Sequence, residues 1–248
     1  MQRVLVTGGG TGIGLAISTA FLADGASVVV GQRTEGEARS AEARLRGKGG
    51  TVVGIGADLA FAEGCRALVA RAAEALGGLD IVVNNAAITG PPAIAPFAEF
   101  DDELLDLIID VNLKAPFRIA REAVRHMGRS GVIVNISSVG GSAAEENAAA
   151  YCGSKGGLDM LTKALAIELA SRRIRVVGVA PGDILTGRGR AADRTRAAER
   201  PSRYARMTPI GRRGRPDDIG RAVVYLVSDR ASFVTGTTLR VDGGRLAY

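Results

Sequence analysis

Arg3-Val-Leu-Val-Thr7 runs directly into Gly8-Gly-Gly-Thr-Gly12-Ile-Gly14, and apolar residues at helical spacing follow: Leu15, Ile17, Phe21 and Leu22. The apolar run predicts a buried strand, and the spacing after the glycines predicts a helix. Glycines at such a junction let the backbone approach a pyrophosphate, and the helix N-terminus favours the anion. This stretch therefore predicts a dinucleotide-binding turn.

The same alternation of apolar runs and helical patterns continues along the chain. Further strands are expected at 27–31, 51–55, 79–83, 131–136, 174–180 and 237–241, and helices at 36–47, 61–76, 101–127, 148–170 and 216–228, with a kink at Pro116. This order predicts an α/β fold, a Rossmann-like doubly wound parallel sheet of about seven strands with helices on both faces. No linker-like break appears, so we expect one dinucleotide-binding and catalytic domain over residues 1–248, with a substrate lid at about 187–210.

Composition excludes several classes of protein. The 248 residues are 46% hydrophobic and 23% charged, which is typical of a globular chain, and no apolar run is long enough to span a membrane. Cys65 and Cys152 have neither metal-ligand spacing nor a disulfide framework, so we expect no metal site and a cytoplasmic location.

The net charge of +6 belongs to one segment. Residues 188–215 hold ten arginines and two acids, a balance of +8, while the other 22 basic and 24 acidic residues sum to −2. Aromatic residues make up only 4%. This pattern disfavours a nucleic-acid binder. It predicts an electropositive lid over the substrate entrance, with a solvated face that only aids solubility as the alternative.

Gln32 and Arg33 follow the second predicted strand. In dinucleotide-binding units an acid at this place binds the adenine ribose 2′-hydroxyl, whereas an arginine accommodates a 2′-phosphate. No acid stands here. The pair therefore predicts a preference for NADP(H) over NAD(H), with a solvated surface arginine as the alternative.

Tyr151 and Lys155 lie four residues apart within a predicted helix, so their side chains share one face. A neighbouring ammonium favours the phenolate and lowers the pKa of a tyrosine. Ser138, at the end of the strand at 131–136, could hydrogen-bond a substrate oxygen. These residues predict a general acid/base site, whereas the pair alone would fit a solvated helix face.

Together these motifs resemble those of the short-chain dehydrogenase/reductase family in its compact single-domain branch, essentially from end to end. Asn84-Asn85-Ala86, Pro181-Gly182, Pro209–Pro216 and Val241–Gly244 match further signatures of that family. The resemblance implies hydride transfer between a nicotinamide and a carbon bearing oxygen. It implies a catalytic tetrad of Asn112, Ser138, Tyr151 and Lys155, in which Asn112 positions a water. It also implies cofactor contacts from Gly8, Gly10, Thr11, Gly12, Ile13, Gly14, Gln32, Arg33, Asp58, Leu59, Asn85, Ala86, Tyr151, Lys155, Pro181, Gly182, Ile184 and Thr186.

Two departures from the family pattern concern small residues. Ala87 stands where relatives usually carry glycine, and Thr11 stands where NADP-preferring members often carry a basic residue. The second departure weakens the expected NADP preference. Asp183 lies beside the predicted nicotinamide segment and has no assigned role.

Three functions remain open. The leading one is an oxidoreductase acting on a ketone or secondary alcohol, and it includes 3-oxoacyl-carrier-protein reductases, whose acidic carrier protein would dock on Arg129 and Arg172. The second is a non-catalytic dinucleotide-binding regulator, and the third is a nucleic-acid binder built on the basic segment. The resemblance also implies a homotetramer that associates through the helices at 101–127 and 149–171 and the last strand.

Overall fold

The structure is a computed structural model, and it describes residues 1–90, 93–186 and 207–247. Its strands form one parallel seven-stranded sheet in the order β3-β2-β1-β4-β5-β6-β7. The strands are β1 (Arg3–Thr7), β2 (Ser27–Gln32), β3 (Thr51–Gly56), β4 (Leu79–Asn84), β5 (Met127–Ile136), β6 (Ile174–Pro181) and β7 (Thr238–Val241). The strand order reverses between β1 and β4, which is where ligands bind in open parallel sheets.

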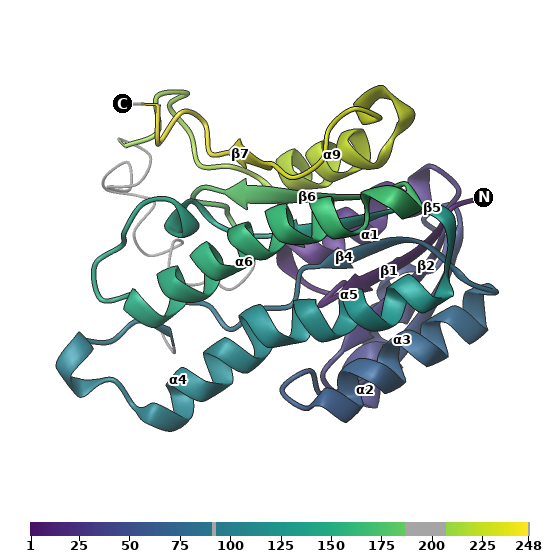
Figure 1. Ribbon diagram of the computed structural model, residues 1–248, viewed down its shortest axis with the longest axis horizontal. Coiled ribbons are helices and arrows are strands. Elements are labelled where there is room, and N and C mark those ends of the chain that lie inside the picture. Colours follow the sequence, from purple (N-terminus) through teal and green to yellow (C-terminus); the bar gives the residue numbers. More distant parts are fainter. Residues whose placement is uncertain (91–92, 187–206, 248) are drawn as a thin grey trace.

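Helices cover both faces of this sheet (Figure 1). They are α1 (Gly12–Ala23), α2 (Glu35–Leu45), α3 (Ala62–Leu76), α4 (Asp102–Ile109), α5 (Ala115–His126), α6 (Ala149–Glu168) and α9 (Pro216–Val227). The predicted fold class is thereby confirmed.

Two apolar layers hold the helices to the sheet. On one face Ile17 and Phe21 of α1 pack with Val223 of α9 against the strands. On the other face Leu68 of α3 and Ile119 of α5 pack against the strands, together with the last turns of α6. All four of these large side chains and Val223 are buried. Because both faces are covered, the central strands β1, β2, β4 and β6 are mostly apolar runs rather than alternating ones.

The predicted helix at 101–127 is divided rather than simply kinked. It comprises α4, one π-helical turn at Asp110–Lys114, and α5, in which Pro116 lies in the first turn. A proline is tolerated in a first helical turn because the missing N–H has no partner there. The π turn carries Asn112, and such turns are frequent at functional sites.

Register brings the polar strand ends to one edge of the sheet. Thr7 of β1 pairs with Gly31 of β2, and Asn84 of β4 pairs with Asn135 of β5. The residues expected to bind cofactor and substrate follow these ends in the chain.

No helix within the described residues is long and apolar enough to cross a membrane.

Candidate active site

The glycine-rich turn between β1 and α1 is a backbone cradle. Gly8 and Gly12 have positive φ angles of 63° and 51°, which side-chain-bearing residues rarely adopt. A Cβ on Gly14 would collide with the carbonyl oxygen of Gly8. Thr11 caps α1 without a side-chain hydrogen bond, so no side chain competes for the first N–H groups of the helix. This arrangement fits a pyrophosphate.

The residues after β4 fasten this cradle. The Thr7 hydroxyl oxygen accepts hydrogen bonds from the N–H groups of Asn85 and Ala86, both at 3.0 Å. The Asn85 side-chain amide donates to the carbonyl oxygens of Thr7 at 2.9 Å and Gly8 at 3.2 Å. Asn85 and Ala86 thus hold the turn in place, and their contact with a cofactor stays a prediction.

The end of β2 differs from the expectation in one respect. Gln32 was expected to face the ribose, but its side chain folds onto the glycine-rich turn, where its amide oxygen accepts from the N–H groups of Gly9 at 3.2 Å and Gly10 at 2.5 Å. The reason is local: two backbone N–H groups lie within reach and need an acceptor. Arg33 is exposed and pairs with Glu37 at 3.6 Å.

Asp58 and Leu59 follow β3 at the same edge of the sheet. Leu59 is buried, while Asp58 is exposed and accepts from the N–H of Ala60 at 3.0 Å. This local turn uses one oxygen of the Asp58 carboxylate. The position is compatible with the expected contact to adenine.

Ser138 and Tyr151 come together from different elements. Ser138 follows β5, and its hydroxyl oxygen accepts from the N–H of Gly140 at 3.0 Å. Burial raises the pKa of the Tyr151 phenol, and hydrogen bonds with the hydroxyls of Ser138 and Thr89 oppose the shift. The pKa is therefore raised, whereas the sequence predicts a lowered one. The reason is that burial destabilises the phenolate more than the two hydrogen bonds stabilise it. The phenol is therefore protonated at neutral pH.

Lys155 is completely buried one helical turn below Tyr151. Its Nζ lies 5.8 Å from the centre of the tyrosine ring and donates to the carbonyl oxygen of Ile136 at 2.8 Å. Burial lowers the pKa of Lys155 to about 8, and the carboxylate of Asp159 opposes this. At pH 7 the ammonium form still dominates.

Asn112 lies next to this group through its hydrogen bonds. Its amide nitrogen donates to the carbonyl oxygen of Ile88 at 3.0 Å and to the hydroxyl of Ser154 at 3.2 Å, and its oxygen accepts from the N–H of Ile88 at 2.8 Å. Ser154 in turn donates to the carbonyl oxygen of Tyr151 at 2.7 Å. Both amide hydrogens are thus used to hold the chain after β4 against α6.

The chain after β6 closes the cradle. Pro181 ends β6, and the γ-methyl of Thr186 lies 3.4 Å from where a Cβ on Gly12 would stand. Ile184 pairs with Gly214 in an isolated bridge. This segment, Pro181–Thr186, therefore runs from the sheet toward the start of α1, and its contact with a nicotinamide stays a prediction.

Asp183 has a partner that the sequence did not indicate. Its carboxylate receives two parallel contacts from Arg213, at 2.6 and 2.7 Å, and both side chains are largely buried. A bidentate pair of this kind is geometrically specific. It fastens the chain after β6 to the chain before α9.

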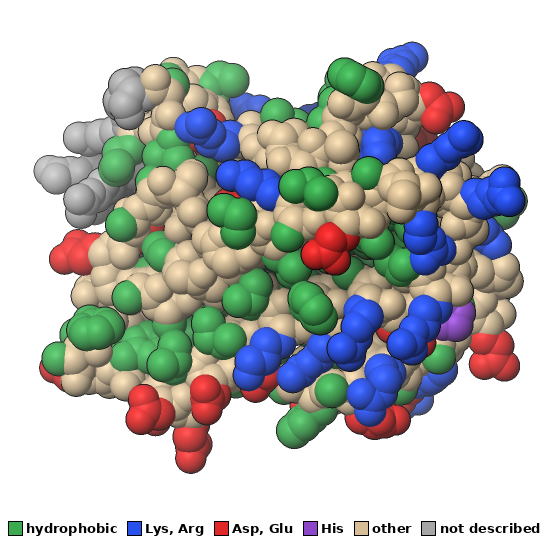
Figure 2. Space-filling model, viewed as in Figure 1, with side chains coloured by type: hydrophobic (Ala, Val, Ile, Leu, Met, Phe, Trp, Pro, Cys, Tyr) green, Lys and Arg blue, Asp and Glu red, His purple; other side chains and the backbone are tan. Residues whose placement is uncertain are grey.

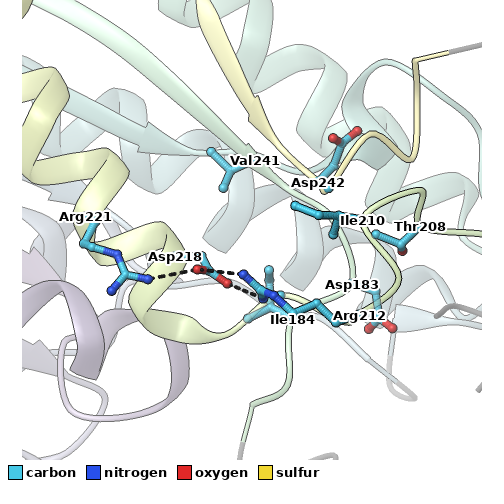
Figure 3. A pocket seen from close by; sticks show the side chains of 11 residues that line it. Asp183, Ile184, Thr208, Ile210, Arg212, Asp218, Arg221, Val241 and Asp242 are labelled. Atoms are coloured by element: carbon cyan, nitrogen blue, oxygen red, sulfur yellow. Dashed lines mark hydrogen bonds and ion pairs between the residues drawn. The ribbon is translucent and has the colours of Figure 1, made fainter. Parts of the chain in front are cut away.

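A cavity of about 280 Å³ lies beside this junction, outside the Ser138–Tyr151 group (Figure 3). Asp218 at the start of α9 points between Arg212 and Arg221, with contacts of 2.8 and 3.0 Å. The hydrogen bond from Arg212 is the main reason that the pKa of Asp218 lies well below its usual range. Arg212 and Arg221 thus share the single carboxylate of Asp218.

Two residues that contribute hydrogen bonds to this site were not predicted from the sequence. Thr89 follows the Asn-Asn-Ala motif by three residues and reaches the phenol of Tyr151. Ser154 lies inside the Tyr-to-Lys stretch and links Asn112 to α6. Their nearness to those motifs was the only available signal. Most of the expected lid at 187–210, and of the arginine-rich segment 188–215, lies outside the described residues.

Known proteins resemble the chain over nearly its whole length. Residues 8–245 match a family model described as enoyl-(acyl carrier protein) reductase. A 2-(S)-hydroxypropyl-CoM dehydrogenase of Xanthobacter autotrophicus is 38% identical, covering 99% of this chain and 97% of its own. A 3beta-hydroxysteroid dehydrogenase of Eggerthella lenta is 39% identical, covering 100% and 94%. The structure of a short-chain dehydrogenase from Burkholderia cenocepacia in complex with NADP superposes with a TM-score of 0.87 at 32% identity, covering 98% and 97%.

Proposed function

Because this chain belongs to the short-chain dehydrogenase/reductase family, we propose that it is an oxidoreductase that interconverts a ketone and a secondary alcohol with a nicotinamide cofactor. The observation that carries the proposal is the convergence of Ser138, Tyr151 and Lys155 beside the glycine cradle. A non-catalytic regulator would not require a partly buried phenol and a buried ammonium on adjacent turns of one helix.

Tyr151 is the proton donor in ketone reduction. Its raised pKa keeps the proton on the phenol at neutral pH. Ser138 receives its hydrogen bond from Gly140 through its oxygen, so its own hydrogen can turn toward a substrate carbonyl. The two hydroxyls then polarise the carbonyl, and the phenol proton passes to the oxygen as alkoxide character develops.

Lys155 stabilises the tyrosinate that remains. The ammonium is buried near the ring, and an opposite charge acts strongly at a place of low dielectric constant. Its hydrogen bond to Ile136 fixes its position.

The side-chain amide of Asn112 donates both its hydrogens, to Ile88 and to Ser154. A contact between Asn112 and a water must therefore use its side-chain oxygen or its backbone. We keep the water-positioning role of Asn112 as part of the proposal.

The cradle fits the cofactor's pyrophosphate. Its glycines leave no room for Cβ atoms, and α1 presents its N-terminus there. In this proposal Tyr151 and Lys155 would meet the nicotinamide end of the cofactor. The bound nicotinamide supplies or accepts the hydride, and the protein orients the reacting atoms.

We further propose a preference for NADP(H). Gln32 and Arg33 are the residues at the end of β2, and neither is an acid that would repel a 2′-phosphate. Arg33 is exposed, and its ion pair with Glu37 is weak enough to exchange for a phosphate.

Both Cys65 and Cys152 are free, which is consistent with the cytoplasmic location that we propose.

A carrier-protein reductase is the weaker alternative. Arg172 donates to the carbonyl oxygen of Met127 at 3.1 Å, two residues before the exposed Arg129, so the two arginines share the start of β5. Ser138 follows the other end of that strand, roughly 30 Å away for ten residues. A carrier protein docked at these arginines would therefore serve a second subunit's site rather than this one.

A homotetramer is also proposed. Exposed apolar side chains gather over α4, α5 and α6 on the face shown in Figure 2. Phe117 of α5 is 46% exposed, and Met160 and Ile167 of α6 are 61% and 79% exposed. An apolar face of this kind suits an interface between copies. It includes the helices through which the family resemblance implies association.

The decisive experiment is a panel of ketones and secondary alcohols with NADPH, NADP⁺, NADH and NAD⁺, followed by nicotinamide absorbance. It includes a carrier-protein-bound 3-oxoacyl chain. Turnover of simple ketones supports the proposal. Turnover of the carrier-bound chain alone would favour the alternative, and binding of the dinucleotide without turnover of any member would favour a regulator.

A further inference from the structure

Arg44 reaches from the far end of α2 back to the glycine-rich turn. Its Nη1 donates to the carbonyl oxygen of Gly10 at 3.0 Å, across 34 positions of sequence. The residue lies one helical turn beyond Ala41 and near the end of α2. No motif in the sequence singles it out.

The contact lies at the adenosine end of the dinucleotide cradle. A Cβ on Gly10 would stand 2.6 Å from the end of the Gln32 side-chain amide and would collide with Ala41. Gly10 is therefore enclosed between the end of β2 and α2. The end of β2 is the part of such a fold that meets the adenine ribose, so the guanidinium of Arg44 lies close to where a 2′-phosphate would stand.

The charge of Arg44 is not cancelled nearby. Among the described residues no carboxylate forms an ion pair with it, whereas Arg33 pairs with Glu37 at 3.6 Å and Arg46 with Glu42 at 2.8 Å. A guanidinium has five N–H donors, and the bond to Gly10 uses one of them. The remaining donors can meet a phosphate.

We propose that Arg44 is a cofactor-specificity residue that binds the adenosine 2′-phosphate together with Arg33. It supplies the second cation that Thr11 does not provide. The proposal rests on the proposed NADP(H) preference and adds to it a residue of α2. A guanidinium held by a backbone carbonyl is already oriented, so little side-chain freedom is lost on binding.

A purely structural role would act differently. If Arg44 only ties α2 to the turn, its loss would loosen the whole adenosine end and weaken every adenine nucleotide alike. If it binds the phosphate, its loss would weaken only ligands that carry a 2′-phosphate. Arg44→Gln separates the two roles, because it removes the charge and keeps a neutral amide donor at the same position.

The test is calorimetric titration with adenosine 2′,5′-bisphosphate and with adenosine 5′-monophosphate. We expect Arg44→Gln to weaken the bisphosphate about tenfold and to change the monophosphate less than twofold, since one charge-assisted contact is lost at a partly exposed place. Arg44→Lys should recover part of the loss. Arg46→Ala is the matched control, because it removes the same charge from the same helix end without touching the turn, and we expect no change. The wild-type preference should also shrink as salt rises.

Equal weakening of both nucleotides by Arg44→Gln, or no weakening, would overturn the role of Arg44 while leaving the NADP(H) preference intact. A wild type that binds both nucleotides equally would instead overturn the preference itself, and the inference with it. Should Arg44→Gln fold poorly by circular dichroism, Arg44→Lys decides: its bisphosphate affinity must fall selectively, because an ammonium lacks the planar fork.

Discussion

The Nζ atom of Lys155 lies 5.8 Å from the centre of the Tyr151 ring, and its hydrogen bond goes to the carbonyl oxygen of Ile136 rather than to the phenol. The two side chains share a face of α6, as their spacing of four requires. Burial nevertheless dominates both groups: it raises the pKa of the phenol and lowers that of the ammonium to about 8. Each group is thus drawn toward its neutral form, and the site has a proton to donate at neutral pH.

Tyr151→Phe should reduce the maximal rate by about 10²–10⁴-fold, because the phenol proton is needed in the chemical step. Dinucleotide affinity should stay within a few-fold of wild type. Steady-state kinetics with calorimetric titration measures both quantities. A variant that kept more than about a tenth of the rate would remove Tyr151 from the proton-transfer role.

Lys155→Met should change how stability depends on pH. The depressed pKa of Lys155 means that the unfolded chain binds more protons than the folded one between pH 8 and 10.5, so this residue makes the folded state more stable as pH rises through that window. Relative to Lys155→Met, the wild-type free energy of unfolding should rise by up to about 3 kcal/mol across the window. Urea unfolding at pH 7.5 and pH 10 measures the difference. An equal change in the free energy of unfolding between the two pH values for both proteins would contradict the lowered pKa of Lys155.

Gly14→Ala should damage the cradle. The added methyl meets the carbonyl oxygen of Gly8 and comes within 2.5 Å of the Asn85 amide nitrogen. Overpacking of this kind costs about 1–3 kcal/mol, and we expect dinucleotide affinity to fall at least tenfold. Gly36→Ala is the control, since its methyl would meet only Thr34 at 4.0 Å and should stabilise α2 by up to about 1 kcal/mol. Thermal unfolding and calorimetry compare the two, and normal binding by Gly14→Ala would contradict the role of the turn.

Arg33→Ala should weaken NADPH about tenfold and leave NADH almost unchanged, because only the 2′-phosphate needs the guanidinium. The double variant Gln32→Asp/Arg33→Ala should prefer NADH, since a carboxylate at this position binds the ribose 2′-hydroxyl and repels a 2′-phosphate. Dissociation constants for both reduced cofactors test this. If Arg33→Ala weakened both equally, Arg33 would be a surface arginine only.

Ile167→Arg should lower the mass of the assembly. Ile167 is 79% exposed on α6, on the face that we propose to be covered by another copy. A buried unpaired charge would oppose association there. Phe61→Arg, on a residue 65% exposed before α3, is the control that should leave the mass unchanged. Light scattering measures it, and a wild-type monomer at micromolar concentration would refute the tetramer.

The sequence by itself determined the order of elements and the fold class. Strand-like runs and helical spacing depend on neighbours a few residues apart, so they can be read along the chain. The same locality placed Gly8–Gly14 at a strand-to-helix junction and Tyr151 and Lys155 on one helix face. The boundaries that shifted, such as the division of 101–127 by a π turn, depend on packing against other elements.

Only the tertiary structure decided which way side chains turn and which are removed from water. Gln32 folds onto Gly9 and Gly10, Asp183 meets Arg213 thirty residues away, and Arg44 reaches Gly10 across thirty-four. The direction of the Tyr151 pKa also belongs here, because its first cause is burial by elements distant in sequence. Spacing along a chain records proximity within an element, whereas solvation and long-range pairing arise only when separate elements meet.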